Sequence, residues 1–240
     1  MKIAILADTH FGARNDSQLF LDYFTDFFEK TFFPECEKRG IKTIIHLGDL
    51  MDRRKFVNFN TLSQMREKFV NPLVTGQYDF HCIVGNHDTY FKNTNNVNSP
   101  VELFGDRYEN IHIYDSPVSI TLDGCKFGLV PWINKENEAE CLGFMEDSDA
   151  KILCGHLELN GYQVMRGVDY TGGLDPVHVK KFDRVFTGHF HQKHEKENVH
   201  YFGTAYQMTF NDLFEKKGFH IYDTETDEIE FVENPDRRFH

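Results

Sequence analysis

The sequence has few cysteines and no long apolar segment, and both shortages exclude classes of protein. Its five cysteines include no Cys-x-x-Cys pair, which argues against a disulfide framework and for reduced thiols in a cytosol. No uninterrupted apolar run approaches the roughly 18 residues that a membrane helix needs. The opening residues also lack the long apolar core of a signal peptide. We therefore expect a cytoplasmic protein without membrane contact, in the host cytoplasm if the protein is viral.

Positive charge is also scarce. The chain has 26 Lys and Arg against 38 Asp and Glu, a formal net charge of −12, which argues against broad nonspecific binding to nucleic acid or anionic lipid. A nucleic-acid substrate is still compatible with this charge, because bound cations or a partner chain can supply local positive charge. With 240 residues, 40% of them hydrophobic, the chain can bury a core without disulfides or metal. No repeat or Pro/Gly/Ser-rich linker divides it, so we treat residues 1–240 as one domain.

Short apolar runs and amphipathic segments predict the secondary structure. Helical spacing of apolar residues predicts helices over 17–39, 58–74, 136–145 and 176–181. Apolar runs predict strands over 3–7, 43–47, 80–84, 111–114, 127–130, 152–154, 184–187, 199–202, 218–222 and 229–232. Early strands alternate with helices, which favours parallel pairing, whereas the later strands follow one another closely, which favours antiparallel meanders. The predicted fold class is mixed α/β (α+β), with two stacked mixed β-sheets flanked by helices.

The first predicted helix carries a broad aromatic stripe. Its members are Phe20, Tyr23, Phe24, Phe27, Phe28, Phe32 and Phe33. We expect the stripe to pack into the core. The alternative is that surplus aromatic residues form a two-fold interface in a homodimer, which a measured solution mass would decide.

One pattern recurs along the chain: an apolar strand ends, and residues of metal-ligand type follow at once. These strand-end motifs are Asp8-Thr9-His10, Gly48-Asp49, Gly85-Asn86-His87-Asp88, Gly155-His156 and Gly188-His189-Phe190-His191. In open α/β sheets, ligands bind just beyond the carboxyl ends of strands, and Gly permits the tight turn that aims the next side chain over the sheet edge. The five strand ends could therefore converge on one spot.

The residues that would converge suit a pair of divalent ions. Mixed carboxylate, amide and imidazole donors favour Mn²⁺, Fe²⁺ or Zn²⁺ over Ca²⁺ or Mg²⁺, and the absence of a Cys quartet argues against a structural zinc site. The ligands outnumber what one ion needs, so we expect two ions, with Asp49 as the bridge. Two such ions about 3.5–4 Å apart form a clamp for in-line attack on phosphorus, and the balance of charge at the centre favours an anionic phosphate ester.

The motifs differ in strength when they are taken singly. Asp-x-His and Gly-Asp are both compatible with ordinary turns, and an alternating strand could expose both histidines of Gly-His-x-His. Their joint appearance, in this order and each at a strand end, is what makes the interpretation specific. The remaining histidines have no such context and are interpreted as core or surface residues: His46, His81, His112, His178, His194, His200, His220 and His240.

The ordered set of motifs resembles the calcineurin-like metallophosphoesterase superfamily over positions 8–191. Within it, the chain is most similar to the SbcD-type double-strand-break repair nucleases, and especially to the small subunit of phage recombination endonucleases. The segments that support this narrower resemblance are 48–54 (GDLMDRR), 130–132 (VPW), 155–161 (GHLELNG) and 187–191 (TGHFH).

The resemblance implies roles for individual residues. It implies one ion held by Asp8, His10, Asp49 and His191, and a second held by Asp49, Asn86, His156 and His189. His87 matches the family's catalytic histidine, which acts on the scissile phosphate or the leaving oxygen. Asp88 is expected to orient His87 or the turn. Some relatives carry His at the position of Asp52, which leaves a substrate-handling role there open. Apart from the resemblance, a basic strip for a DNA backbone, or simply a solvated helix face, could be formed by Arg53, Arg54, Lys55 and Arg66.

The resemblance also implies an activity and partners. It implies a DNA nuclease of repair and recombination, most often Mn²⁺-dependent with Mg²⁺, Fe²⁺ or Zn²⁺ as alternatives. Such an enzyme acts as an exonuclease on ends and an endonuclease on single strands or hairpins, by attack of a metal-bridging hydroxide assisted by His87. An SMC-like ATPase subunit (SbcC-type) is the implied partner. The family's DNA-capping and ATPase-binding regions are expected to be absent, because the chain stops at His240.

Two alternatives stay open on the sequence. One is a metal-dependent phosphatase or a small-molecule or cyclic-nucleotide phosphodiesterase, which the net charge of −12 favours. Protein phosphatases of the superfamily typically end the third motif in Glu, so Asp88 counts against that subgroup. The other alternative is a non-catalytic scaffold of the same fold, against which stands the complete set of metal ligands.

Overall fold

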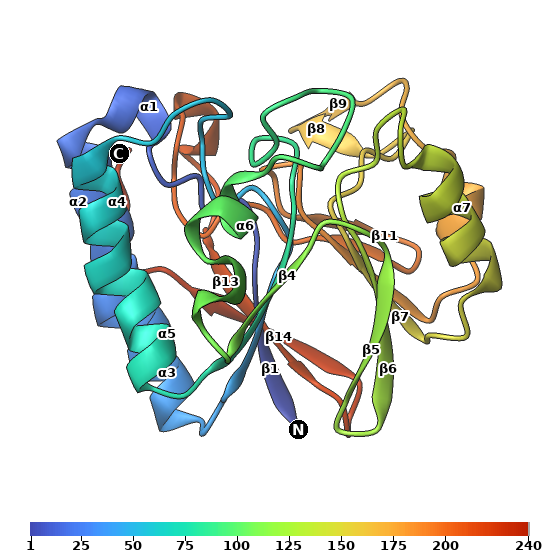
Figure 1. Cartoon of the computed structure of the whole chain (residues 1–240), viewed down its shortest axis with the longest axis horizontal. Helices are drawn as coiled ribbons and strands as arrows, with labels where there is room; N and C mark the ends of the chain where they lie inside the picture. The colour runs from blue at the N-terminus through green and yellow to red at the C-terminus, as the bar shows by residue number, and fades with distance from the viewer. Residues whose placement is uncertain (240) are drawn as a thin grey trace.

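Two six-stranded sheets lie face to face and carry helices on their outer sides (Figure 1). The computed structural model describes residues 1–239, with Asp106 described by its backbone alone. The first sheet has the order β14-β13-β1-β2-β3-β4. Its strands are β1 (Lys2–Leu6), β2 (Thr43–His46), β3 (Asp79–Ile83), β4 (Ile111–Tyr114), β13 (Gly218–Asp223) and β14 (Glu228–Glu233). As predicted, β1 to β4 pair in parallel.

The second sheet has the order β11-β12-β10-β7-β6-β5. Its strands are β5 (Val118–Leu122), β6 (Cys125–Val130), β7 (Ile152–Gly155), β10 (Arg184–Thr187), β11 (His194–Lys196) and β12 (Val199–Tyr201). A small hairpin of β8 (Gln163–Met165) and β9 (Val168–Asp169) lies apart from both sheets. The prediction of antiparallel meanders is right for β13–β14. The pairs β5–β6 and β11–β12 are antiparallel too, but each includes a strand, β5 or β11, that was not predicted. The prediction is wrong for β6, β7, β10 and β12, which pair in parallel because helical or looped crossovers separate them in the chain.

The two long predicted helices are each a continuous helical stretch whose middle turn is wider than an α-helix. The first comprises α2 (Gln18–Phe27), η1 (Phe28–Phe32) and α3 (Phe33–Lys38), and the second comprises α4 (Phe59–Met65), η2 (Arg66–Val70) and α5 (Asn71–Thr75). The shorter helices are α1 (Ala13–Asp16), α6 (Ser99–Leu103), η3 (Gly105–Arg107), α7 (Glu138–Asp147), η4 (Pro176–Val179) and η5 (Phe210–Asp212). Within residues 1–239, none of these helices is long and apolar enough to cross a membrane.

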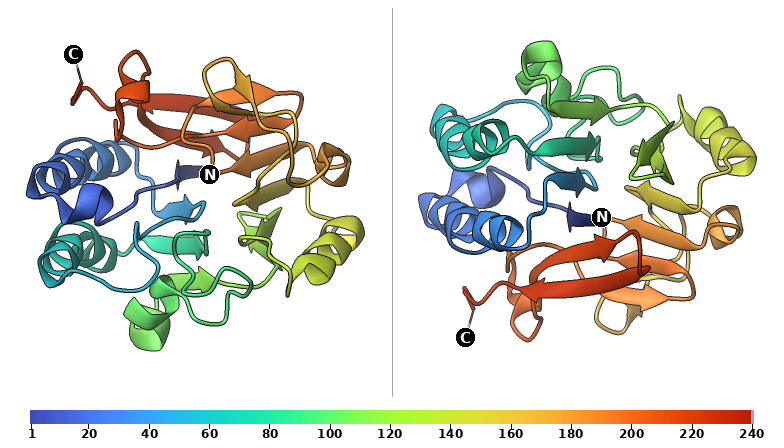
Figure 2. Two further views of the ribbon diagram at one scale, coloured as in Figure 1. Left: turned by 90° about the horizontal axis from the view of Figure 1, so that it is seen from above. Right: turned by 90° about the horizontal axis from the view of Figure 1, so that it is seen from below.

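The apolar core has three layers, which follow from the period of two along each strand. On β3, Phe80 and Cys82 face the two long helices, whereas Ile83 faces the second sheet. Helix α7 covers the outer face of the second sheet, so that the order of layers is helices, sheet, sheet, helix (Figure 2). Of the aromatic stripe, Phe24, Phe27, Phe28 and Phe32 are buried in the layer between the first sheet and its helices. The prediction of core packing is confirmed. The stripe is therefore not available as a dimer interface, and the homodimer itself stays a prediction.

His220 is a buried titratable group within this core. It lies on β13, faces the second sheet, and stacks its ring on Phe202 at a centroid distance of 4.0 Å. Burial, together with the nearby charges of Lys193 and His200, lowers the pKa of His220 to about 3. The native state therefore holds this imidazole neutral, while the unfolded chain protonates it near pH 6.5.

We predict that His220 makes the fold sensitive to acid. Between pH 6.5 and 3 the unfolded chain binds the extra proton, so the free energy of unfolding falls as the pH drops, by up to about 1.4 kcal/mol per pH unit for this group. In urea denaturation measured in the presence of EDTA, the free energy of unfolding of His220→Phe should fall less steeply with decreasing pH than that of wild type. His178→Asn, at an exposed position, serves as the control, and an equal slope in His220→Phe and wild type would contradict the assignment.

Candidate metal centre

The five strand-end motifs meet at one edge of the two sheets. They follow β1, β2, β3, β7 and β10, which run in parallel within their sheets, so that their carboxyl ends reach the end of the molecule opposite the N-terminus in Figure 1. The connecting backbones bond to one another: the amide of Asp8 donates to the carbonyl of Gly48, and the amide of His10 donates to the carbonyl of Asp49. The convergence expected from the sequence is therefore present in the structure.

Backbone strain is concentrated at these motifs. Asp8, His10, Asp49 and His189 have φ angles of 52°, 44°, 56° and 83°, in the left-handed region that L-residues rarely adopt. Each such residue costs on the order of 1 kcal/mol and persists only where its surroundings fix it, which is typical of functional sites. Gly85 is required by the same crowding, because a Cβ there would collide with the backbone nitrogen and the carboxylate of Asp49.

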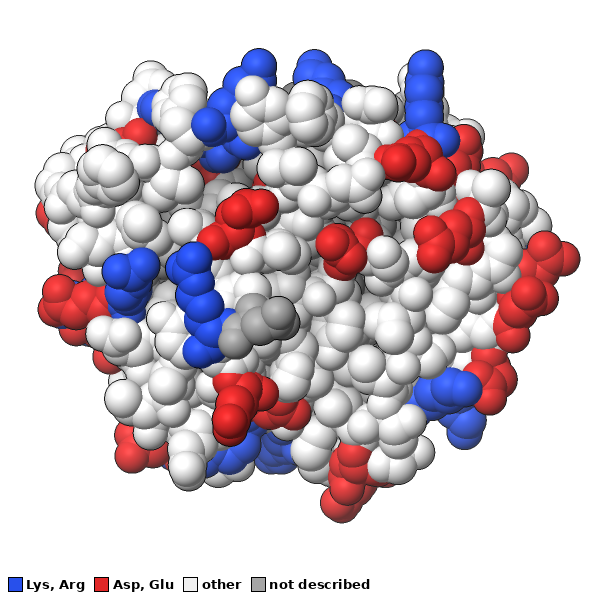
Figure 3. Space-filling model, in the orientation of Figure 1, with Lys and Arg blue, Asp and Glu red and all other residues white. Residues whose placement is uncertain are grey.

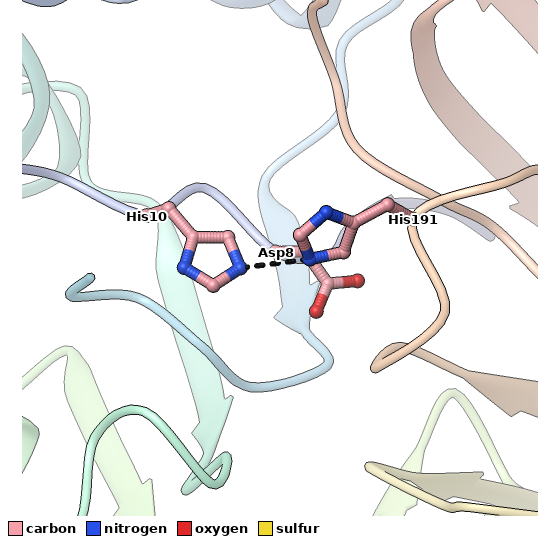
Figure 4. Close-up of side chains that lie close together, drawn as sticks. All are labelled: Asp8, His10 and His191. Carbon is pink, nitrogen blue, oxygen red and sulfur yellow. Dashed lines mark hydrogen bonds between the residues drawn. The ribbon is translucent and has the colours of Figure 1, made fainter. Parts of the chain in front are cut away.

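A first group of donors consists of Asp8, His10 and His191. The Nε2 atoms of His10 and His191 lie 3.0 Å apart (Figure 4), and a carboxylate oxygen of Asp8 lies within 4.8 Å of both rings' donor atoms. Burial holds the pKa of His191 well below its ordinary value, and His10 adds to the effect. A neutral imidazole keeps the lone pair that a metal ion requires. The group therefore fits one divalent cation.

A second group of donors consists of Asn86, His156 and His189. The Oδ1 atom of Asn86 lies 2.9 Å from Nε2 of His156 and 2.9 Å from Nδ1 of His189. The Nδ1 of His156 lies 2.7 Å from the carbonyl oxygen of Leu47. Donation of that Nδ1–H fixes the tautomer and leaves Nε2 of His156 free as a ligand. The side chain of His156 is fully buried, so its orientation is held from all sides.

Asp49 lies between the two groups. Its Oδ2 is 3.6 Å from Nε2 of His10, and its Oδ1 is 3.5 Å from Nε2 of His156. Burial by itself would raise the pKa of Asp49, but His156, His10 and His87 outweigh burial and hold it well below its ordinary value. A carboxylate that stays ionised and turns one oxygen to each group has the geometry of a bridging ligand. All seven predicted ligands are thus brought together, in two groups that share Asp49.

His87 lies beside the two groups. Its amide donates to Oδ1 of Asp49 at 2.7 Å, and its Nδ1 lies 2.7 Å from the carbonyl oxygen of Asp52. That contact leaves Nε2 of His87 free to meet a substrate. Its ring packs edge-on against His10 at a centroid distance of 4.8 Å, and His10, Asp52 and His87 also form a close donor cluster of their own.

Of the two roles predicted for Asp88, its hydrogen bonds fit positioning of the backbone turn and not orientation of the His87 ring. Its carboxylate accepts hydrogen bonds from the backbone amides of Met51 and Gly85, both at 2.9 Å, and from that of Leu50 at 3.3 Å. Burial, followed by the charge of Asp49, raises the pKa of Asp88 to about 6. The buried carboxylate thereby ties the loop after β2 to the loop after β3, which are the two loops that carry Asp49 and Asn86.

The remaining predicted residues lie at the rim of the centre. Oδ1 of Asp52 is 3.4 Å from Nδ1 of His10, so Asp52 orients a ligand. Arg53 pairs with Asp16 at 3.2 Å, and Arg54 donates to the hydroxyl of Thr89 at 3.4 Å. Both arginines follow the loop that carries Asp49 and are partly exposed, and the charge of Arg53 is paired with that of Asp16.

Two neighbours of the centre were missed in the sequence. Oε1 of Glu158 lies 3.4 Å from Nε2 of His189, and it orients that ring so that Nδ1 faces Asn86. The ring of Trp132 lies 5.2 Å from that of His189. Together with His156 and Glu158, Trp132 lines a cavity of about 360 Å³ beside the second group. Both residues lie in segments that directly follow apolar strands, and this position in the sequence was the signal that could have predicted them as neighbours of the site.

Comparisons with known proteins agree with this geometry. The family model described as calcineurin-like phosphoesterase matches residues 1–193. The chain belongs to the calcineurin-like phosphoesterase family. It is 37% identical over 234 residues to exonuclease subunit 1 of Enterobacteria phage T4, covering 98% of this chain and 68% of that protein. It is 24% identical over 260 residues to a subunit of the nuclease SbcCD from Staphylococcus epidermidis, covering 95% of this chain and 67% of that protein.

A solved structure with a similar fold supports the architecture. The Plasmodium protein GAP50, described as the anchor in the inner membrane complex, superposes with a TM-score of 0.52 at 13% sequence identity. The match covers 99% of this chain and 90% of that one. At this identity the likeness shows the fold alone, and it confirms the predicted class of two mixed sheets flanked by helices.

We predict that Asp88→Ala weakens both stability and metal binding. The variant leaves three buried amides without their acceptor, which costs about 2–4 kcal/mol of unfolding free energy, and it loosens the loops of Asp49 and Asn86. We expect Mn²⁺ affinity to fall about 10- to 100-fold, as for other residues that orient metal ligands. Denaturation in EDTA and calorimetric titration with Mn²⁺ would measure the two effects. Asp88→Asn, which keeps an acceptor oxygen, should lose less of both, and unchanged affinity in Asp88→Ala would contradict the role.

Proposed function

We propose that the chain is the catalytic part of a metal-dependent DNA nuclease that hydrolyses phosphodiester bonds. One observation carries the proposal: the two oxygens of Asp49 face two separate donor groups, at 3.6 Å and 3.5 Å from the nearest imidazole nitrogens. Such an arrangement fits two divalent ions that share a carboxylate. The similarity to relatives named as an exonuclease subunit and a nuclease subunit favours DNA as the substrate.

We assign separate roles to the residues of the centre. Asp8, His10 and His191 would hold one ion, Asn86, His156 and His189 the other, and Asp49 both. The ions supply Lewis-acid stabilisation of the phosphate and activation of a water molecule when they are bound. Manganese suits this mixture of oxygen and nitrogen donors. His87 extends its free Nε2 toward the substrate side, where it donates a hydrogen bond or a proton to the phosphate or the leaving 3′ oxygen as the P–O bond breaks.

The chain is proposed to act in DNA repair and recombination in the cytoplasm, of the host if the protein is viral. Both curated relatives are named as subunits, which favours a partner chain, and an SMC-like ATPase of the SbcC type fits that place. A partner would also supply positive charge that this acidic chain lacks. We further propose that residues 1–240 form a single catalytic domain.

A substrate panel with Mn²⁺, Mg²⁺ and chelator tests the activity. We expect Mn²⁺-dependent cleavage of linear duplex, single-stranded and hairpin DNA, and little turnover of a phosphomonoester or a cyclic nucleotide. His87→Ala should lower the cleavage rate about 10²- to 10⁴-fold while Mn²⁺ still binds, because His87 contacts the substrate rather than the ions. Brisk turnover of the phosphomonoester without DNA cleavage would favour a phosphatase, and full activity of His87→Ala would remove that residue from the mechanism.

We predict that Arg53 and Arg54 contact the DNA backbone. Lys and Arg side chains project along the upper rim in Figure 3, the end at which the strands carry the metal centre. Replacing both arginines by Ala should weaken DNA binding and reduce the slope of log affinity against log salt by about 1 to 2. The double variant Lys2→Ala, Lys126→Ala removes the same charge near the opposite strand ends and should leave the slope unchanged. An identical slope in the arginine variant would exclude the contact.

A further inference from the structure

A second cluster of metal-ligand side chains lies away from the metal centre. Asp79 and His81 lie on the same face of β3, two residues apart, and His112 lies opposite His81 in the register of β3 and β4. This face is the one turned toward the second sheet, because the intervening Phe80 packs against the helices. Asp79 begins β3, whereas Asn86 follows its carboxyl end, so the length of the strand separates this cluster from the metal centre.

The donor atoms of the cluster have the spacing of a metal site. Nε2 of His81 lies 3.1 Å from Oδ2 of Asp79, and Nε2 of His112 lies 2.8 Å from Oδ1 of Asp79. One donor atom from each residue lies within 4.8 Å of the other two. Tetrahedral Zn²⁺ with bonds of about 2.0–2.1 Å separates its ligands by about 3.3 Å. Small side-chain rotations would therefore place all three donors around one ion.

The surroundings orient His81 as metal sites do. The hydroxyl of Tyr114 lies 2.8 Å from Nδ1 of His81, which directs Nε2 toward Asp79. The ring of His81 lies nearly parallel to those of His112 and Tyr114, at centroid distances of 4.9 and 5.9 Å. Burial lowers the pKa of His81 and so keeps its imidazole neutral.

Solvent reaches the cluster from one side. His81 is buried, whereas the side chains of His112 and Asp79 are 40% and 46% exposed. An ion held by these three residues would keep a fourth position for water, and no entry path through the core is needed. The titratable groups that act on His81 are Asp79 and His112. Among these groups, a bound cation would be close to one carboxylate and to no ammonium or guanidinium group.

We propose that Asp79, His81 and His112 bind a single Zn²⁺ ion, or a transition ion of similar softness, that joins β3 to the edge strand β4. Two imidazoles and one carboxylate are a ligand set that suits Zn²⁺. The site is separate from the proposed nuclease centre and acts on the sheet rather than on the phosphate. It does not depend on the proposed function.

The test counts zinc on the full chain. Metal-free protein is dialysed to equilibrium against buffered Zn²⁺, and bound zinc per chain is measured by mass spectrometry of the metal. We expect His112→Ala, at a half-exposed position, to bind one equivalent fewer than wild type. Asp79→Asn should bind that equivalent at least tenfold more weakly. Zn²⁺ should also raise the melting temperature of wild type further than that of His112→Ala.

The control variant is His178→Ala, which removes another exposed imidazole and should keep the full zinc content. Mn²⁺-dependent turnover by His112→Ala should equal that of wild type, which separates this site from the nuclease centre. Equal zinc content in wild type and His112→Ala would overturn the proposal. Loss of the same equivalent in His178→Ala would also overturn it, because zinc would then bind surface imidazoles without this cluster.

Discussion

The position of the Asp49 carboxylate is the constraint on which the rest of the centre depends. It lies fully buried, ionised and within 3.6 Å of imidazoles from both sheets. An uncompensated carboxylate at this depth would cost several kcal/mol. The surrounding imidazoles compensate it in part, and bound cations would compensate it further. The strained backbone at Asp8, His10, Asp49 and His189 directs polar side chains into the same small volume.

The architecture explains how side chains so far apart in the chain reach that volume. Each ligand follows the carboxyl end of a buried strand, and these ligand-bearing strands, β1, β2 and β3 in one sheet and β7 and β10 in the other, end at the same edge of the molecule. Asp88 then ties two of the ligand loops together through three backbone amides. Strands, loops and a buried carboxylate thus fix the ligands before any ion arrives, which lowers the cost of ordering them on binding.

The sequence predicted the centre well because its signals are local. A buried strand appears in the sequence as an apolar run, and the polar residues directly after it are easily identified. The grouping of His10, Asp49 and His156 could therefore be expected. The alternation of early strands and helices likewise predicted the parallel pairing of β1 to β4. Edge strands such as β5 and β11 were missed because they carry polar or exposed residues, and their conformation depends on pairing with a neighbour.

The interactions that were missed depend on register. Glu158 meets His189 because the loops after β7 and β10 follow paired strands, and Asp79 lies between His81 and His112 through the register of β3 and β4. The parallel addition of β12 to β10 was missed for the same reason, since strands close in sequence usually form hairpins. Composition did not help either, because a net charge of −12 describes the whole surface and not the edge at which the donors meet.

The most direct test of a centre bridged by Asp49 is anomalous diffraction from a crystal grown with Mn²⁺. We expect two manganese peaks, one on each side of the Asp49 carboxylate, with His10 and His191 at the first peak and Asn86 and His156 at the second. A single peak that does not touch Asp49, or no peak at this edge of the sheets, would contradict the bridged centre.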